Sequence, residues 1–324
     1  MLNGLGLGGI HLGRAGHIVC AGLPCPFHCR KEGERIFIFK EGYESIVRSA
    51  ECGVRNSGLS NRQSAIPNPR TVKGRGQYPC VVLENGKTVI MRRVRHGGLW
   101  GKIAGGVLWG VGRPVRELIN AKECLERGVP TAEIVGIRLE RVLGGFGTFL
   151  GVALPLFRAE VFSKEIPATI DLLGLLTSPQ EFHQHKRAII RAVAMAVRAM
   201  HEVGLYHNDL HLKNILITMP SLGRPFKAFV IDLDKSSLHE RLLLSQKIKN
   251  LLRLDRSIEK FMAVGAYCNT PLLLRDKLRF LRDYMGSDPS AAAWKELARR
   301  LNPRYTFHRL WWKITKIANY RLQI

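Results

Sequence analysis

Two short polar stretches, each joined to an apolar run, constrain this chain more than any other feature. Residues 205–216 read LYHNDLHLKNIL and contain Asp209 and, five positions later, Asn214. Residues 227–236 read KAFVIDLDKS, and Asp232 directly follows an apolar run that predicts a buried strand. The flanking apolar residues predict that both loops are anchored on a rigid core. Either stretch alone would fit an ordinary polar loop, but the two together, in this order, indicate a site.

The residue types in these loops suit phosphoryl transfer. That reaction needs positioning and neutralisation of phosphate charge more than covalent work by the protein. Asp209 can accept or orient the proton of an attacking hydroxyl, while Asn214 and Asp232 offer a neutral and an anionic oxygen ligand. Mg²⁺ prefers such hard oxygen ligands. An Asp and an Asn five apart, followed by a strand that ends in Asp, match the order and spacing of protein-kinase motifs.

The charge of the chain favours anionic partners. Its 324 residues include 50 basic and 26 acidic side chains, which gives a net charge of +24. Such a field attracts nucleic acid, phosphate-bearing substrates or an anionic membrane surface. The hydrophobic content of 46% predicts a globular protein with a sizeable core. The longest uncharged run, residues 142–157, is too short to span a bilayer, so we expect a soluble or peripheral protein.

The seven cysteines are unevenly spaced, which favours reduced thiols in the cytoplasm over a disulfide framework. The tightest group is CAGLPCPFHC, with Cys20, Cys25, His28 and Cys29. A zinc site is the alternative there, but the spacings do not match common zinc-binding pairs, so free thiols are favoured. The first residues also lack the basic start of a secretory signal.

The region after residue 70 predicts a small β-rich part that handles phosphates. Strands are expected at 77–83 and 87–94, joined by a hairpin at Asn85-Gly86. Gly74 and Gly76 precede the first strand, where small residues would let backbone N–H groups approach phosphates. Earlier, IFIF at 36–39 suggests one strand in an otherwise uninformative segment.

A helix is expected at 114–127, with Glu117 near its start. A glutamate on the corresponding kinase helix pairs with the basic residue of the preceding strand, here Arg92 or, less favoured, Arg93. A surface or helix-dipole carboxylate is the alternative for Glu117.

The rest of the chain predicts two further strands and a helical part. The strands are expected at 131–141 and 145–157, with a turn at Gly144-Gly145. Residues 160–172, which include Lys164 and Glu165, are interpreted as a connector whose backbone groups would hydrogen-bond an adenine edge. Buried-face periodicity predicts a helix at 181–203, ended by Gly204, that delivers the catalytic loop. Basic helices follow Asp234, and Trp311 and Trp312 are expected to complete the core.

The sequence resembles the lipopolysaccharide kinases, a bacterial family that phosphorylates Kdo or heptose in the inner core. The resemblance covers roughly residues 72–285 and is carried by GRG, RRVRHGGL, RPVREL, ERGVP, HNDLHLKNIL, VIDLDKS and NLLRLDRSIEK. It implies an α+β, two-lobed protein-kinase-like fold, with a small β-rich N-lobe at 71–165 and a mostly helical C-lobe at 166–324. Residues 1–70 would be an extension.

The resemblance also implies ATP with Mg²⁺, a lipopolysaccharide acceptor and a place on the cytoplasmic face of the inner membrane. By position, Asp209 matches the catalytic residue, and Asn214 and Asp232 match the metal ligands. Arg92 and Glu117 match the phosphate-contacting pair, although protein kinases usually have Lys at the Arg92 position. His211 lies two residues after Asp209, where protein kinases have a lysine near the nucleotide, and this difference argues against a protein substrate.

Two alternatives remain open at this point. One is a different kinase-like enzyme, acting on a small molecule or as an atypical protein kinase, since HNDL is also common in the former. The other is a non-catalytic protein, either a pseudokinase or a nucleic-acid-binding module whose charge neutralises phosphates. The sequence shows no aromatic–basic interleaving of the kind that nucleic-acid readers use, and Asp209, Asn214 and Asp232 are intact.

Overall fold

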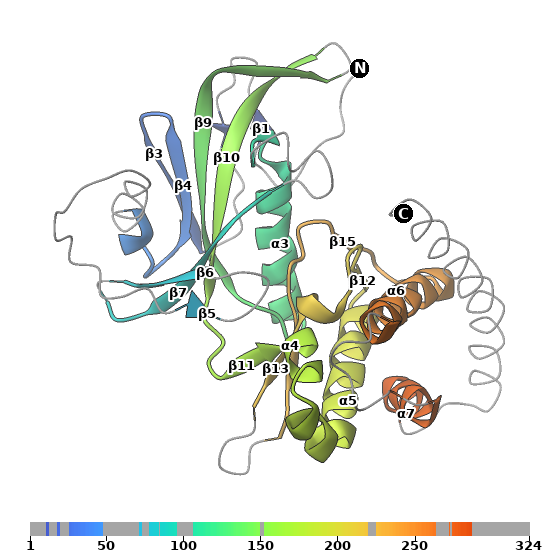
Figure 1. Cartoon of the computed structure of the whole chain (residues 1–324). Coiled ribbons are helices and arrows are strands. Elements are labelled where there is room, and N and C mark those ends of the chain that lie inside the picture. The colour runs from blue at the N-terminus through green and yellow to red at the C-terminus, as the bar shows by residue number, and fades with distance from the viewer. Residues whose placement is uncertain are drawn as a thin grey trace, which may run out of the picture. The chain divides into compact units, whose positions relative to one another are not determined.

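The computed structural model describes residues 11–12, 18–19, 26–47, 71–72, 78–83, 85–95, 106–149, 152–219, 225–263, 272 and 274–286. The chain divides into two compact units, residues 1–170 with 229–237, and residues 171–228 with 238–324. The first is rich in strands and the second in helices (Figure 1), which confirms the expected α+β class with a β-rich N-terminal part. Among the described residues, none of the helices is both long enough and apolar enough to cross a bilayer.

An antiparallel sheet of long and short strands forms the body of the first unit. Its order is β3-β4-β9-β10-β7-β6-β5, with β8 paired to β10. The strands are β3 (Phe27–Glu32), β4 (Arg35–Lys40), β5 (Thr71–Val72), β6 (Tyr78–Val82), β7 (Thr88–Arg93), β8 (Leu108–Trp109), β9 (Ile134–Phe149) and β10 (Val152–Lys164). Two shorter strands, β1 (His11–Leu12) and β2 (Ile18–Val19), pair with each other.

The IFIF segment is the buried strand β4, as expected. Phe37 and Phe39 pack in one core cluster with Val89 of β7 and Phe162 of β10. The hairpin at Asn85-Gly86 is also confirmed, because β6 and β7 pair antiparallel and Leu83 N–H donates to the Lys87 carbonyl at 2.8 Å. Gly86 has a φ of +75°, a conformation that the turn requires and that other residues adopt at a cost.

Helix α3 (Gly112–Glu126) lies alongside β9 and β10 in the first unit (Figure 1). Its buried face carries Val115, Leu118 and Cys124 at helical spacing, and Pro114 occupies its first turn. Residues after Glu126 close the helix through hydrogen bonds from Gly128 N–H to the Leu125 carbonyl and from Val129 N–H to the Cys124 carbonyl. The expected helix at 114–127 is thus confirmed, and its start is two residues earlier.

Two expectations about β9 and β10 are wrong. The turn was expected at Gly144-Gly145, but β9 continues through it to Phe149. Pairing shifts there, since Pro155 lies opposite Phe146 and Phe157 opposite Arg141, so the two glycines fall in an irregular part of the strand. The connector expected at 160–172 also begins too early. Strand β10 extends to Lys164 because residues 160–164 pair with β7 and bury Val161 and Phe162.

The second unit is built from helices around a long central one. Its elements are α4 (Leu172–Leu176), α5 (Pro179–Glu202), β12 (Leu205–Tyr206), the short 3₁₀ helix η1 (Leu212–Asn214), β13 (Ile215–Thr218), α6 (Leu244–Ala263) and α7 (Leu274–Met285). Three short strands, β11 (Thr169–Asp171), β14 (Ala228–Val230) and β15 (Ser237–Leu238), include the points at which the chain passes between units. Helices α4 to α7 line an apolar cavity of about 390 Å³.

Helix α5 confirms the expected buried stripe, with Ile189, Val193, Ala196 and Met200 all buried. It ends before Gly204, as expected, and the φ of Gly204 is +83°. A Cβ atom at this position would lie 1.9 Å from the His239 carbonyl oxygen, so only glycine fits where the helix turns into the next loop.

Candidate active site

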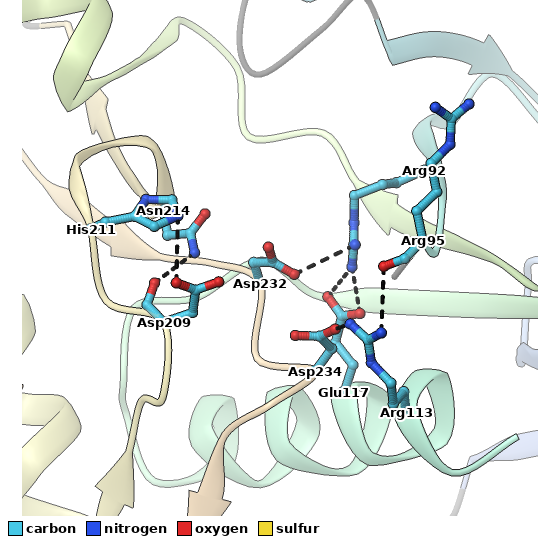
Figure 2. A network of polar contacts seen from close by, with 9 residues as sticks. All are labelled: Arg92, Arg95, Arg113, Glu117, Asp209, His211, Asn214, Asp232 and Asp234. Carbon is cyan, nitrogen blue, oxygen red and sulfur yellow. Dashed lines mark hydrogen bonds and ion pairs between the residues drawn. The ribbon is translucent and has the colours of Figure 1, made fainter. Parts of the chain in front are cut away.

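The loop after β12 places the predicted catalytic residues of the second unit close together. The Asn214 side-chain amide donates to the Asp209 carbonyl oxygen at 2.9 Å, and His211 Nε2 lies 3.8 Å from Asp209 Oδ1 (Figure 2). The Asp209 side chain is 35% exposed, whereas Asn214 is buried. Because its amide nitrogen is used within the loop, the amide oxygen of Asn214 is the atom suited to a cation.

Helix α6 forms hydrogen bonds with the backbone of this loop through two polar residues that sequence reasoning missed. Asn250 accepts from the backbone N–H of His207 at 3.1 Å and donates to its carbonyl oxygen at 2.9 Å. Ser257, two turns further along, accepts from Leu212 N–H at 3.0 Å. Within the loop, Asp209 N–H donates to His207 Nδ1 at 3.1 Å. The loop backbone is therefore fixed on both sides of Asp209.

Asn250 also connects the loop to α5 and α7. His201 on α5 contacts Asn250 Oδ1 through Nε2 at 3.1 Å and the Tyr284 hydroxyl through Nδ1 at 2.7 Å. All of these groups are buried. Burial lowers the pKa of His201 to about 4, so the imidazole is neutral in the folded protein at neutral pH.

We expect the second unit to lose stability as the pH falls from about 6.5 towards 4. In that window the unfolded chain binds a proton at His201 that the folded chain does not, because the folded pKa is depressed; stability therefore rises with pH. Thermal midpoints measured by circular dichroism at several pH values should show this slope in the wild type and a shallower one in His201→Gln. Equal slopes for the two proteins would contradict the assignment.

The predicted phosphate-contacting residues of the first unit also come together. Arg92, on β7, donates to both carboxylate oxygens of Glu117 on α3, and its Nη1 lies 3.4 Å from Asp232 Oδ1 (Figure 2). The Glu117 side chain is only 4% exposed, against 23% for Arg92. The pairing of Glu117 with Arg92, rather than with Arg93, is thus observed. Arg93 Nε instead lies 3.2 Å from Glu160.

Charges in this cluster depend on one another. Burial disfavours the charge on Arg92, but the carboxylates of Glu117 and Asp232 outweigh it and raise the pKa of the guanidinium. Burial, together with Asp232 and Asp234, raises the pKa of Glu117 to about 7, although Arg92 opposes this rise. Glu117 consequently relies on Arg92 to keep its negative charge near neutral pH.

Two other predicted site residues, Lys164 and Glu165, use their backbone N–H groups within the first unit. Lys164 ends β10, and its backbone N–H donates to the Glu133 carbonyl at 2.8 Å, while Glu165 N–H donates to the Thr88 carbonyl at 3.3 Å. Their contact with an adenine edge stays a prediction. Gly74 and Gly76 lie outside the described residues.

The cysteine expectations have a mixed outcome. Cys80 and Cys124 are buried, reduced thiols, as expected, and Cys80 Sγ contacts Glu165 Oε2 at 3.8 Å. Cys29 on β3 is disulfide-bonded, so the expectation of a free thiol at that position is wrong. Cys20 and Cys25 lie outside the described residues, as do Trp311 and Trp312.

Comparisons with known proteins place these residues in context. The model of the lipopolysaccharide kinase (Kdo/WaaP) family matches residues 69–284. The 3-deoxy-D-manno-octulosonic acid kinase of Vibrio cholerae is 28% identical over 191 residues, which cover 58% of this chain and 72% of that protein. The lipopolysaccharide core heptose(I) kinase WaaP of Escherichia coli is 28% identical over 193 residues, covering 55% and 69%. The solved structure of WaaP in complex with acyl carrier protein matches with a TM-score of 0.46 and 20% identity, covering 83% of this chain and 99% of that chain.

Proposed function

Because this chain belongs to the lipopolysaccharide kinase (Kdo/WaaP) family, we propose that it transfers the terminal phosphate of ATP to a Kdo or heptose hydroxyl of the lipopolysaccharide inner core. The observation that carries the proposal is the loop in which Asp209, His211 and Asn214 are held together and anchored on α6. Family membership also confirms the resemblance drawn from the sequence. It makes the chain a kinase that uses ATP.

Each group in the two clusters has a place in the proposed reaction. Asp209 accepts the proton of the sugar hydroxyl as its oxygen bonds to the terminal phosphorus of ATP. The bond from that phosphorus to the bridging oxygen breaks, and ADP leaves with the electron pair. Arg92, held by Glu117, would bind the phosphates of ATP.

The donors present fit Mg²⁺. The Asn214 side-chain nitrogen donates to the Asp209 carbonyl, which leaves its amide oxygen as the atom for a cation. Asp232 supplies a carboxylate, whose Oδ1 lies 3.4 Å from Arg92 Nη1. Both residues therefore offer the hard oxygen atoms that this ion prefers. When bound, the ion would neutralise and orient the phosphate oxygens of the nucleotide. Asn214 and Asp232 would hold it.

The acceptor is itself anionic and amphipathic, which agrees with the charge of the chain. A net charge of +24 would attract a phosphorylated glycolipid and an anionic membrane surface. We therefore place the protein at the cytoplasmic face of the inner membrane, in peripheral contact with it. Between the two sugars we favour Kdo, because the GRG element and the arginine-rich run that ends in two glycines are similar to those of Kdo kinases.

Purified protein should phosphorylate an inner-core acceptor in the presence of ATP and Mg²⁺. Two acceptors separate the sugars: lipid A that carries Kdo alone, and a core extended with heptose. Mass spectrometry of the products should show one added phosphate on Kdo, and the Asp209→Asn variant should form far less of this product in the same time. Absence of product with both acceptors, beside an active kinase of this family as control, would count against the proposal. Phosphate on heptose alone would replace Kdo as the acceptor.

A further inference from the structure

One face of helix α3 carries Glu117 and two further residues that contact the segment after Asp232. Arg113, Glu117 and Asn120 are spaced by four and three positions, so they lie along one side of the helix. Glu117 holds Arg92, as described above. The other two contact the chain directly after Asp232, and all of these residues belong to the first unit.

Arg113 binds Asp234, two positions after Asp232. Its guanidinium forms an ion pair with the Asp234 carboxylate, and its Nη1 donates to the Arg95 carbonyl at 3.4 Å (Figure 2). The Asp234 side chain is only 5% exposed. A carboxylate so deeply buried needs a charged partner, and Arg113 supplies it. Asp234 is therefore occupied by the helix rather than directed at a ligand.

Asn120 binds the backbone of the same segment twice. Its side-chain amide donates to the carbonyl oxygens of Leu233 at 3.1 Å and Ser236 at 3.0 Å, and the side chain is buried. Ser236 N–H in turn donates to the Leu233 carbonyl at 3.0 Å, which closes a tight turn. On the other side of Asp232, Val230 N–H donates to the Pro130 carbonyl at 2.9 Å.

These contacts matter because Asp232 has a strained backbone. Its φ is +67°, in the left-handed region that residues other than glycine seldom adopt. Such a conformation persists where the surrounding structure fixes the chain on both sides. Pro130 fixes the chain before Asp232, and Arg113 and Asn120 fix it after.

We propose that Arg113, Asn120 and Asp234 are positioning residues that hold Asp232 in register with the Arg92–Glu117 pair. This inference deepens the proposed function and rests on it, because Asp232 is assigned there as a ligand of Mg²⁺. Since one helical face holds both Arg92 and the segment after Asp232, the phosphate-binding guanidinium and the metal-binding carboxylate are set by the same element. Residues of this kind commonly alter metal affinity about 10–100-fold when replaced.

The test compares variants that disrupt the Arg113–Asp234 ion pair with a control variant that disrupts another buried ion pair of the first unit. Asp234→Asn and Arg113→Met break the pair under study, and Arg113→Lys keeps its charge. Glu160→Gln is the matched control, because the Glu160 side chain is 8% exposed, close to the 5% of Asp234, and is ion-paired with Arg138 on the neighbouring strand β9. Two quantities are measured: the Mg²⁺ concentration for half-maximal turnover, and hydrogen exchange of amides 233–237 in protein without nucleotide.

Both test variants should raise the Mg²⁺ requirement about 10–100-fold and speed exchange at 233–237, with Arg113→Lys nearer to the wild type. The control should lower the thermal midpoint and leave both quantities unchanged. Unaltered exchange in Arg113→Met, an unaltered Mg²⁺ requirement beside reduced turnover, or equal shifts in the control would overturn the inference. If the wild type transfers no phosphate, the proposed function fails, while the exchange measurement still decides whether the helix holds this segment.

Discussion

Replacing Asp209 with asparagine should lower turnover by about 10²- to 10⁴-fold, the usual contribution of a positioned general base. Asparagine has the same shape but cannot take up the proton of the sugar hydroxyl at neutral pH. The Asp209 backbone should be undisturbed, because its contacts with His207 and Asn214 use the main-chain N–H and carbonyl groups. The measurement is the rate of phosphate transfer at saturating ATP and acceptor.

Two controls keep this result specific. Glu181→Gln changes an exposed carboxylate near the start of α5 and should leave turnover unchanged. The affinity of Asp209→Asn for ATP, measured by calorimetry, should remain close to that of the wild type, and so should its thermal midpoint. Turnover within a few-fold of the wild type would remove Asp209 from the role of base.

Local patterns in the sequence were sufficient to predict much of this site. The spacing of Asp209 and Asn214, and the apolar run before Asp232, are properties of short segments, and the structure keeps the first two together. The Asn85-Gly86 hairpin and the stripe of α5 are local in the same sense. Arg92 and Glu117 are 25 residues apart, and their pairing was predicted only through a resemblance to kinases.

The residues that sequence reasoning missed act over long separations. Asn250 binds His207 across 43 positions, and Asn120 binds Leu233 across 113. Nothing in a single sequence indicates which distant backbone a buried amide will satisfy. The available signal was weak: both asparagines interrupt the apolar face of a helix, and a buried polar side chain must find a partner. The predicted ends of β9 and β10 were wrong for a related reason. Pairing with β10 continues β9 through Gly144 and Gly145, and pairing with β7 extends β10 to Lys164.

Arg92→Met should be the most damaging change in the first unit, for both stability and activity. It removes the partner of a buried glutamate, and breaking a buried ion pair in this way costs about 3–5 kcal/mol. Glu117 would then face Asp232 and Asp234 without a balancing charge, so its pKa should rise above the wild-type value of about 7. Activity should fall at least about tenfold in kcat/KM for ATP, because a charge-assisted contact with phosphate is lost.

The sign of the pH dependence distinguishes this explanation from a simple loss of packing. A carboxyl group whose folded pKa lies above its unfolded value contributes stability at low pH that is lost as the pH rises through the folded pKa. In the wild type that loss is complete only after the pH has passed the folded pKa of about 7, whereas in Arg92→Met it should continue to higher pH. Thermal midpoints between pH 6 and 9 should therefore diverge, with the variant falling further. Arg92→Lys, which keeps one positive charge but not the double contact, should fall between the two. Parallel midpoints across this range would show that Glu117 does not depend on Arg92 for its charge. An unchanged kcat/KM for ATP in Arg92→Met would show that Arg92 does not bind the nucleotide.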